Sequence, residues 1–345
     1  MDRDNLILAL SESFVSWATF WRIVDRIEIE DLPKKVDYLY SLGVIRENQY
    51  RILSNIDWSK DRKGELEKRG VGYITFYDPN YPSKLNRVKQ PPYVIFYRGN
   101  IELLKLPMVG IVGSRKATKL GREFARSEAS KIAGRGYVVV SGFAQGIDTE
   151  AHEGALISGK TIACFGTSCD DVYPRQNFRL YERMLDSGNL IISPFYRSVG
   201  QKFVFPLRNS IISALSDYLV VVEAGEKSGA VITAMYAFEM GVPIYAVPGR
   251  PWDPSSKGTN RLIKMGARLY ESYRDLGIED IETPVVRKKE KSYPGDLPSG
   301  TFTVEEYADA RGIEVEEAQV ILMELELMGF VTKVAPGIYM SIDRG

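Results

Sequence analysis

Residues 108–146 place two short apolar runs on either side of a helical segment, and each run ends in a glycine-containing turn. The first run stops at Gly113-Ser114-Arg115 and the second at Ser141-Gly142. A strand, a helix and a second strand in this order favour a parallel connection, which brings both turns to the same edge of a sheet. Open α/β sheets bind ligands at that edge, where glycine lets a ligand approach the backbone and free N–H groups favour an anion such as a phosphate.

The segment between the two runs is predicted to be an amphipathic helix. Leu120, Phe124 and Ile132 recur at helical spacing and are expected to share its apolar face. Arg115 and Lys116 precede this helix and add mobile positive charge beside the first turn.

The same alternation of strand and helix continues along the chain. Further strand-like runs lie at 161–165, 190–192, 218–222, 244–247 and 267–270. Helical stretches of ~10–15 residues separate most of them, which predicts a doubly wound, mainly parallel α/β sheet of about seven strands with helices on both faces. Residues 71–99 contain aromatic and β-branched runs broken by prolines, so we expect a connector with strand pieces that packs against this sheet.

At 345 residues the chain should form two or three domains, because one core rarely extends past about 250–300 residues. Residues 1–68 predict a small helical domain, in which an aromatic stripe packs the core rather than stacking on bases. Residues 69–280 contain the α/β pattern. Residues 281–300 are rich in proline, glycine and lysine and predict a linker. Residues 301–345 predict two helices and a two-stranded wing, which is the pattern of a winged-helix domain.

The predicted winged-helix domain is strongly acidic. Between residues 301 and 330, Arg311 is the only basic residue, against Glu305, Glu306, Asp309, Glu314, Glu316, Glu317, Glu324 and Glu326. A winged helix that reads duplex DNA needs a basic recognition helix, because phosphate neutralisation dominates its affinity. We therefore expect this domain to make a protein contact or to serve a regulatory role rather than to bind ordinary DNA.

The whole chain has 45 basic and 45 acidic residues, so any polyanion binding must come from local clusters. Three basic clusters, with net charges of +4, +3 and +4, lie at 114–122, 197–209 and 257–268. All three fall at or just after predicted strand ends. A doubly wound fold is expected to gather several of these cations on one rim.

Metal sites, cofactors and disulfides are not expected. The chain has two cysteines, Cys164 and Cys169, and one histidine, His152, whereas a zinc site usually takes four such ligands. No run approaches the ~18 apolar residues of a membrane span, and the first residues lack a signal-peptide pattern. The sequence thus predicts a soluble, cytoplasmic protein.

Seven short motifs occur in the order in which one protein family has them. They are GSRKAT (113–118), SGFAQGIDTEAH (141–152), YP (173–174), FPLRN (205–209), EAGEKSGAVIT (223–233), AVPG (246–249) and GTNRLI (258–263). Over almost all of residues 71–270 the chain resembles the bacterial DNA processing protein A family, DprA, also called Smf. The resemblance implies an extended Rossmann-like fold between an N-terminal helical, SAM-like domain and a C-terminal winged helix. It also implies a homodimer that binds single-stranded DNA and loads RecA, protecting incoming strands in natural transformation.

The chain departs from the family pattern in two places. Ser210 follows FPLRN where the family usually has another arginine, which would remove a potential phosphate contact. Pro194 stands where an acidic residue is common, and nothing in the sequence explains it.

Single-strand binding needs amides and cations for phosphates, an aromatic face for a base, and polar side chains for base edges. The predicted DNA-binding residues are Gly113, Ser114, Arg115, Lys116, Ser141, Gly142, Lys202, Phe205, Arg208, Asn209, Ser228, Gly229, Lys257, Thr259 and Asn260. Arg115, Lys202 and Arg208 are the expected cations, and three Gly-containing turns are the expected amide donors. Phe205 is the expected stacking face, with core packing as its alternative role.

Binding without catalysis is the favoured interpretation. A serine nucleophile needs an activating base, and His152 lies within a predicted helix, where a structural hydrogen bond is its more typical role. Glu223 ends a strand, but no second carboxylate accompanies it at a recognisable spacing, and a GxGxxG fingerprint is missing. Two alternatives stay open. One is a Rossmann-like nucleotide phosphoribohydrolase, whose PGGxGTxxE motif is missing near 223–229, and the other is a nucleotide or sugar-phosphate sensor, which would leave FPLRN unexplained.

Overall fold

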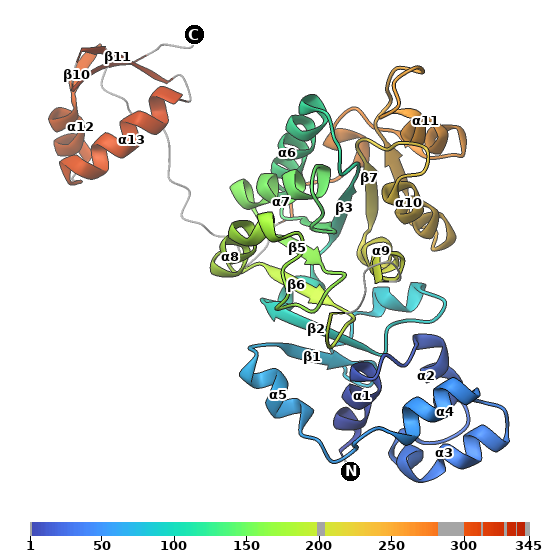
Figure 1. Ribbon diagram of the computed structural model, residues 1–345. Coiled ribbons are helices and arrows are strands. Elements are labelled where there is room, and N and C mark those ends of the chain that lie inside the picture. Colours follow the sequence, from blue (N-terminus) through green and yellow to red (C-terminus); the bar gives the residue numbers. More distant parts are fainter. Residues whose placement is uncertain are drawn as a thin grey trace. The chain divides into compact units, whose positions relative to one another are not determined.

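The computed structural model describes residues 2–198, 204–281, 300–311, 313–327, 330–335 and 337–341. The chain forms two compact units, Met1–Thr283 and Pro284–Gly345 (Figure 1). Lys202 and almost all of the predicted linker 281–300 lie outside the described residues. Among the described helices, none is both long and apolar enough to cross a membrane.

A nine-stranded sheet forms the centre of the first unit. Its strands are β1 (Gly72–Thr75), β2 (Val94–Gly99), β3 (Met108–Val112), β4 (Val138–Ser141), β5 (Thr161–Cys164), β6 (Leu190–Ser193), β7 (Tyr218–Val221), β8 (Ile244–Ala246) and β9 (Arg268–Leu269). Their order across the sheet is β1-β2-β6-β5-β4-β3-β7-β8-β9. The strands from β6 to β9 pair in parallel, and β2 and β1 extend the β6 edge in antiparallel pairing. The predicted mainly parallel sheet is confirmed, and the connector 71–99 contributes two strands to it.

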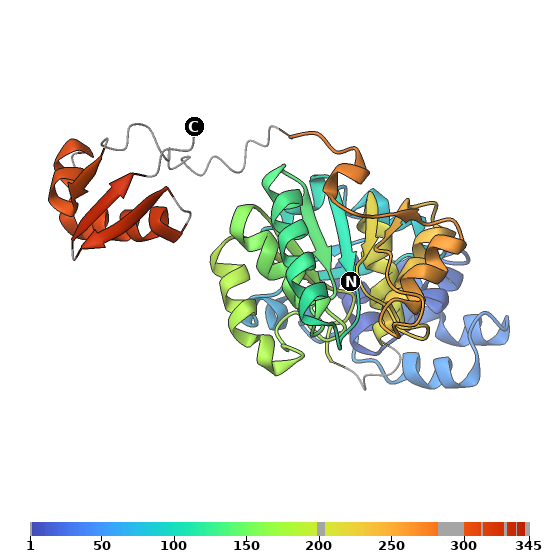
Figure 2. The same cartoon turned by 90° about the horizontal axis from the view of Figure 1, so that it is seen from above.

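Helices cover both faces of this sheet (Figures 1 and 2). The α-helices that follow its strands are α6 (Lys119–Gly134), α7 (Ile147–Ser158), α8 (Phe178–Asp186), α9 (Val204–Leu215), α10 (Gly229–Glu239) and α11 (Lys257–Lys264). Short 3-10 helices are η1 (Ile29–Asp31), η2 (Ser83–Arg87), η3 (Ile101–Lys105), η4 (Arg175–Asn177) and η5 (Tyr273–Leu276). Helices α6 and α7 pack with Val109 and Ile111 of β3, whereas α9 and α10 pack with Met108 and Val112 of the same strand. Successive strand side chains point to opposite faces, so burial of both faces explains the continuous apolar runs.

The prediction that Leu120 shares the buried face of α6 is wrong. Leu120 is 77% exposed, whereas Ile132 is fully buried and Phe124 is partly buried. The buried face of α6 consists mostly of glycine and alanine. Larger side chains do not fit, because α6 and α7 approach so closely that a Cβ atom on Gly154 would overlap the carbonyl of Arg126.

Five α-helices of the described residues precede the sheet and belong to the same compact unit. They are α1 (Arg3–Glu12), α2 (Trp17–Val24), α3 (Leu32–Ser41), α4 (Glu47–Ser54) and α5 (Arg62–Lys68). The aromatic stripe of α2 packs inward: the buried Phe20 ring stacks on Tyr93 at 4.3 Å, and the Trp21 indole N–H donates to the carbonyl of Pro91. This supports the core-packing interpretation of the stripe, while the SAM-like class stays a prediction.

The second unit contains a three-stranded antiparallel sheet and two helices. Its elements are β10 (Thr301–Thr303), α12 (Val304–Arg311), α13 (Val315–Leu327), β11 (Val331–Ala335) and β12 (Ile338–Ser341). The strand order is β10-β12-β11, and Phe302, Tyr307, Leu322 and Leu325 belong to its core. Strand β10 has no counterpart in the sequence prediction, and the winged-helix class stays a prediction.

Candidate functional site

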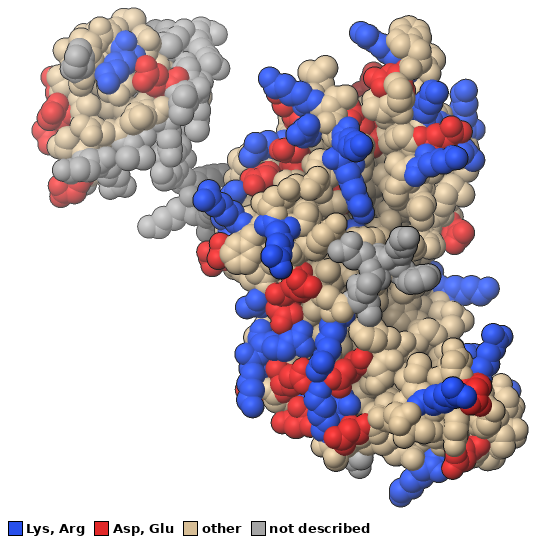
Figure 3. Space-filling view, in the orientation of Figure 1, with Lys and Arg blue, Asp and Glu red and all other residues tan. Residues whose placement is uncertain are grey.

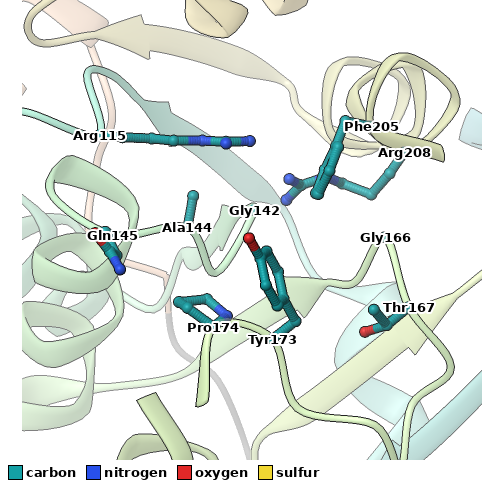
Figure 4. A pocket seen from close by; sticks show the side chains of 10 residues that line it. All are labelled: Arg115, Gly142, Ala144, Gln145, Gly166, Thr167, Tyr173, Pro174, Phe205 and Arg208. Atoms are coloured by element: carbon teal, nitrogen blue, oxygen red, sulfur yellow. The ribbon is translucent and has the colours of Figure 1, made fainter. Parts of the chain in front are cut away.

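Two adjoining pockets open at the carboxyl ends of the central strands, the edge at which the sequence predicts a ligand site. We name the pocket between the turn after β3 and the first turn of α10 the amide pocket, and the pocket shown in Figure 4 the aromatic pocket. They enclose about 1140 and 540 Å³ of empty space, open mouths included. Arg115, Ala144 and Arg208 line both.

The pockets bring together most of the predicted binding residues. Those that line one or both are Gly113, Ser114, Arg115, Lys116, Gly142, Phe205, Arg208, Asn209, Ser228 and Gly229. These residues follow different strands, so the parallel sheet assembles the site from distant parts of the chain, as expected for this edge.

The aromatic pocket combines two rings with one exposed cation. The guanidinium carbon of Arg115 lies 5.0 Å from the centroid of the half-buried Phe205 ring. The Tyr173 ring lies 6.3 Å from Phe205, centroid to centroid, and is tilted by 45°. Figure 4 shows Arg115 reaching across the pocket from the loop after β3 toward Phe205 on α9, with Tyr173 near both. A flat group that enters this pocket can stack on a ring and meet a cation.

Arg208 forms a buried floor beneath both pockets. It is 3% exposed, its Nη1 donates to the carbonyl of Cys164 at 3.0 Å, and its Nε–H has no partner among the described residues. Burial lowers the pKa of Arg208, an effect that the Asp148 carboxylate opposes, and burial likewise raises the pKa of Asp148. The sequence predicts an accessible cation at this position. The structure shows instead a buried cation whose Nε donor is unpaired among the described residues.

The first two turns offer fewer amides than the sequence predicts. The Ser114 N–H donates to the carbonyl of Glu223 at 2.7 Å and is therefore used within the fold. Ser141 is fully buried, its hydroxyl donates to the carbonyl of Ile111, and it lines neither pocket. Ser141 is the last residue of β4 and still pairs with β5, so the structure places it at neither pocket, and its role in binding stays a prediction.

The third turn is the strongest candidate for an anion site. Ser228 is the N-cap of α10, and its buried hydroxyl has no partner in the described part of the chain. Gly229 begins the helix with open space where a Cβ atom would stand. The first N–H groups of a helix lack partners within it and form the positive end of the helix dipole. Asn209 on α9 donates its Nδ2 to the carbonyl of Gly229 at 3.4 Å and fixes α9 beside this site.

Lys257, Thr259 and Asn260 line neither pocket, so the structure does not bring them together with the other predicted residues, and DNA binding by them stays a prediction. Thr259 is buried, and its hydroxyl donates to the carbonyl of Ser256 at 3.1 Å. The Asn260 amide exchanges two hydrogen bonds with the backbone of Gly249, at 2.8 and 3.1 Å. Thr259 and Asn260 of the GTNRLI motif therefore stabilise the loop between β8 and α11. Lys257 is exposed at the start of α11.

The three basic clusters gather at the pockets only in part. Arg115, Lys116 and Arg208 line the pockets. Arg197 instead forms ion pairs of 2.7 and 3.0 Å with glutamates of α1 and α5. Lys202 lies outside the described residues. The cluster at 257–268 lines neither pocket, so one rim does not collect all three.

Helix α9 separates the two pockets from an apolar pocket on its other side. Phe205 and Arg208 face the candidate site, whereas Leu207 and Ser210 line the apolar pocket. Ser210 is buried, and its hydroxyl donates to the carbonyl of Leu207 at 2.7 Å. Contrary to the expectation from the sequence, position 210 does not face the phosphate site. Pro194 lines the same apolar pocket, and nothing there explains this second departure from the family pattern.

Both candidate bases are held within the fold, and neither lines one of the two pockets. Thr118 donates its N–H and its hydroxyl to the two carboxylate oxygens of Glu223, at 2.9 and 2.6 Å. His152 is fully buried, with Nδ1 2.7 Å from the Thr161 hydroxyl. That hydroxyl donates to the carbonyl of Val139, so Nδ1 must hold the imidazole proton and Nε2 is left without a partner among the described residues. Both side chains have structural roles.

Acidic solution is expected to destabilise the protein through His152. Burial lowers the pKa of its imidazole from 6.5 to about 3, so below pH 6.5 the unfolded chain takes up a proton that the folded chain does not. The contribution of neutral His152 to the free energy of unfolding is complete above pH 6.5. It falls by about 1.4 kcal/mol per pH unit between pH 6.5 and about pH 3, so about 2 kcal/mol is lost at pH 5. Denaturant unfolding of the wild type and His152→Asn at pH 7.5 and pH 5 measures this loss. The wild type should lose about 2 kcal/mol more than His152→Asn between the two pH values. An equal loss in both proteins would contradict the prediction.

Several residues of the aromatic pocket have no predicted role from the sequence: Ala144, Gln145, Gly166, Thr167, Tyr173 and Pro174. Gly166 comes soon after β5, as Gly142 follows β4. Glycines after parallel strands are expected at the ligand-binding edge, so the same reasoning applied to β5 would have predicted Gly166 as a pocket residue. The YP motif marks Tyr173 as a family position but does not show where its ring lies, because the path of the loop between β5 and α8 decides that.

An open, mainly parallel α/β sheet with a helix start, cations and aromatic rings at its carboxyl edge is the arrangement typical of Rossmann-like ligand-binding proteins. Residues 72–280 match the family described as DNA recombination-mediator protein A. The chain belongs to this family, in agreement with the order of its seven motifs.

Individual relatives are similar over most of the α/β domain. DNA processing protein DprA of Streptococcus pneumoniae (strain ATCC BAA-255 / R6) is 42% identical over 209 residues, which cover 59% of this chain and 72% of that protein. The X-ray structure of DprA from Streptococcus pneumoniae matches with a TM-score of 0.68 and 33% identity, covering 80% of this chain and 98% of that chain. A structure of DNA processing protein A from Helicobacter pylori, described as giving insight into its single-stranded DNA binding mode, matches with a TM-score of 0.54 and 30% identity. It covers 59% of this chain and 93% of that chain.

Proposed function

We propose that this protein binds single-stranded DNA in the joined amide and aromatic pockets and acts as a recombination mediator without catalysing a reaction. Phosphates bind at the start of α10 and to Lys116, and an unstacked base enters beside Phe205 and Tyr173. The observation that supports this most is the position of Arg115. It lines both pockets and stands 5.0 Å from the Phe205 ring, where one cation serves a phosphate and a base together.

The aromatic pocket favours a single strand over a duplex. In a duplex each base is stacked and paired, and freeing one costs a few kcal/mol. A single strand presents its bases at much lower cost, and stacking on an aromatic side chain contributes roughly 1–3 kcal/mol per base. Because the chain is neutral overall, net charge gives no general attraction for duplex DNA.

The lack of catalysis is part of the proposal. Thr118 donates to both carboxylate oxygens of Glu223, and His152 is fully buried and lines neither pocket, which supports it. Release of a free base or a sugar phosphate from a nucleotide would favour the hydrolase alternative. Tight binding of a mononucleotide, with no affinity for a long strand, would favour the sensor.

The wider role is part of the proposal and rests on the resemblance to the family. The protein would load bound strands onto RecA and protect incoming DNA during natural transformation, as a homodimer. Its C-terminal unit is proposed to contact a protein rather than duplex DNA. Acidic side chains exposed on its described surface support this: Glu305, Glu306, Asp309, Glu314 and Glu326.

Arg115→Ala is expected to lower the affinity for a labelled single strand about tenfold or more. The variant loses a charge-assisted phosphate contact and the cation beside Phe205. The slope of log affinity against log salt should become shallower by about 0.7, the value for one phosphate contact on a single strand. Fluorescence anisotropy with a single strand and its duplex, across a salt series, measures both quantities.

Arg122→Ala is the matched control. Arg122 belongs to the same basic cluster, but its guanidinium donates to the carbonyl of Ala117 at 3.0 and 3.2 Å and lines neither pocket. For Arg122→Ala, the slope of log affinity against log salt should stay close to that of the wild type. Equal, weak binding of the wild type to both kinds of DNA, unaffected by Arg115→Ala, would contradict the proposal and point to small phosphate ligands.

A further inference from the structure

A row of exposed side chains follows Tyr173-Pro174 on η4 and α8, next to the aromatic pocket. Arg175 and Arg179 are exposed, and Phe178 is 50% exposed. Within the described residues, neither arginine side chain forms an ion pair or a hydrogen bond. The two cations and the ring between them take no part in the pockets already described.

Arg175 on η4 lies three and four positions before Phe178 and Arg179 of α8, and all three side chains are exposed around the first turn of α8. The buried side of α8 consists of Leu180, Tyr181 and Met184. The Phe178 ring stacks on Tyr181, with the ring centroids 6.2 Å apart and the ring planes inclined by 26°. Half of the Phe178 surface is therefore left for a ligand.

Asn177 holds the start of α8 against the aromatic pocket. Its Nδ2 donates to the carbonyl of Phe143 at 3.1 Å and to the hydroxyl of Thr149 at 2.9 Å. Both partners flank the loop that supplies Ala144 and Gln145 to the pocket. The outer face of α8 is thus fixed relative to the pocket, which lowers the entropy cost of binding one ligand across both.

An exposed arginine is ordinary on a protein surface, and an exposed ring between two unpaired arginines is less so. The next arginine of the same helix, Arg183, forms an ion pair with Glu153 at 3.0 Å and so has a structural partner. Figure 3 shows basic side chains on this face of the first unit both over α8 and over β3. Alternating cations and aromatic faces are the groups that bind a single strand without regard to sequence.

We propose that Arg175, Phe178 and Arg179 form a second contact surface for single-stranded DNA, the α8 face. A strand that leaves the aromatic pocket past Tyr173 continues along α8, with its phosphates on the two arginines and a base on Phe178. This inference rests on the proposed function of the pockets. It adds the direction in which the strand leaves them and predicts that affinity grows with strand length.

Strand length separates the α8 face from the pockets. For a strand of about 20 nucleotides, Phe178→Ala is expected to weaken binding roughly 5- to 150-fold, the effect of one lost stacking contact. A strand of about four nucleotides, which fills the pockets alone, should bind as it does to the wild type. Arg179→Ala should make the salt slope for the long strand shallower by about 0.7. Phe178→Trp keeps an aromatic face and should restore long-strand binding.

Arg26→Ala is the matched control for the loss of one charge. Arg26 is also exposed and unpaired in the described part of the chain, and it follows α2, on the other side of this unit from α8 (Figures 1 and 2). Its affinity and salt slope should match the wild type for both strand lengths. Thermal unfolding of every variant shows whether the fold is kept.

Three outcomes would overturn the inference. If Phe178→Ala and Arg179→Ala bind the long strand like the wild type while Arg115→Ala loses binding, the α8 face is wrong and the pockets stand. An equal loss for short and long strands in Phe178→Ala would mean that the ring acts through the pocket. If the wild type binds neither strand, the proposed function itself fails, and the α8 face with it.

Discussion

Gly142→Ala is expected to lower the free energy of unfolding by about 3–5 kcal/mol and to abolish single-strand binding. A Cβ atom at this position would overlap the guanidinium of Arg208 and come within 2.7 Å of the Asp148 carboxylate. Moving Arg208 breaks its hydrogen bond to the carbonyl of Cys164 and leaves buried charges without good partners. Loss of a partner of a buried charge destabilises other proteins by about 3–5 kcal/mol. Arg208 lines both pockets, so the same displacement distorts the site.

Gly229→Ala is the matched control for this prediction. It makes the same chemical change in the wall of the amide pocket, where no atom lies within 4 Å of the added Cβ position. Its free energy of unfolding should stay unchanged or rise by up to about 1 kcal/mol, because alanine favours a helix over glycine. Denaturant unfolding at pH 7 and DNA anisotropy measure both variants. A Gly142→Ala protein as stable as the wild type would mean that Arg208 can leave its buried position at little cost.

The order of apolar runs and helical stretches was enough to predict the central sheet. Parallel strands buried on both faces need continuous apolar residues, and such runs are visible in a sequence. The helix faces were less predictable, as α6 illustrates. Leu120 has the right type and spacing for a core residue, but the small residues Ala125 and Ala129 are buried where α6 packs with α7. The distance between two helices is a property of the packed structure and leaves no direct trace in periodicity.

The candidate site shows a similar limit for polar groups. Strand-end position correctly brought Arg115 and Phe205 to one pocket, because topology alone decides which turns meet. It did not show which polar groups the fold already uses. Ser141 and Thr259 are suitable residue types in suitable turns, yet both donate their hydroxyl groups to backbone carbonyls inside the protein. Arg208 is likewise buried by contacts with residues 44 and 60 positions away, which spacing along the chain does not reveal.

Phe205→Leu is expected to weaken single-strand binding roughly 5- to 150-fold, whereas Phe205→Trp should bind close to the wild type. Leucine keeps apolar volume against the neighbouring Gly166 backbone but has no flat face for a base. Stacking on an aromatic side chain contributes about 1–3 kcal/mol, and tryptophan supplies it as phenylalanine does. Anisotropy with a labelled single strand measures the affinities, and denaturant unfolding measures the stabilities.

The two possible roles of Phe205 predict different pairs of results. If its ring only packs the core, leucine should cost up to about 1.5 kcal/mol of stability, and DNA affinity should not change. If its ring stacks on a base, affinity should fall while stability stays nearly constant.

A double variant gives a second test of base stacking by Phe205, because the guanidinium of Arg115 lies 5.0 Å from the ring centroid and both side chains are proposed to contact the same base. The losses of affinity in Phe205→Leu and Arg115→Ala should then be less than additive in the double variant, since groups in contact are coupled. Additive losses of affinity would mean that the two side chains bind the strand independently. The proposal that Arg115 serves a phosphate and a base together would then be wrong.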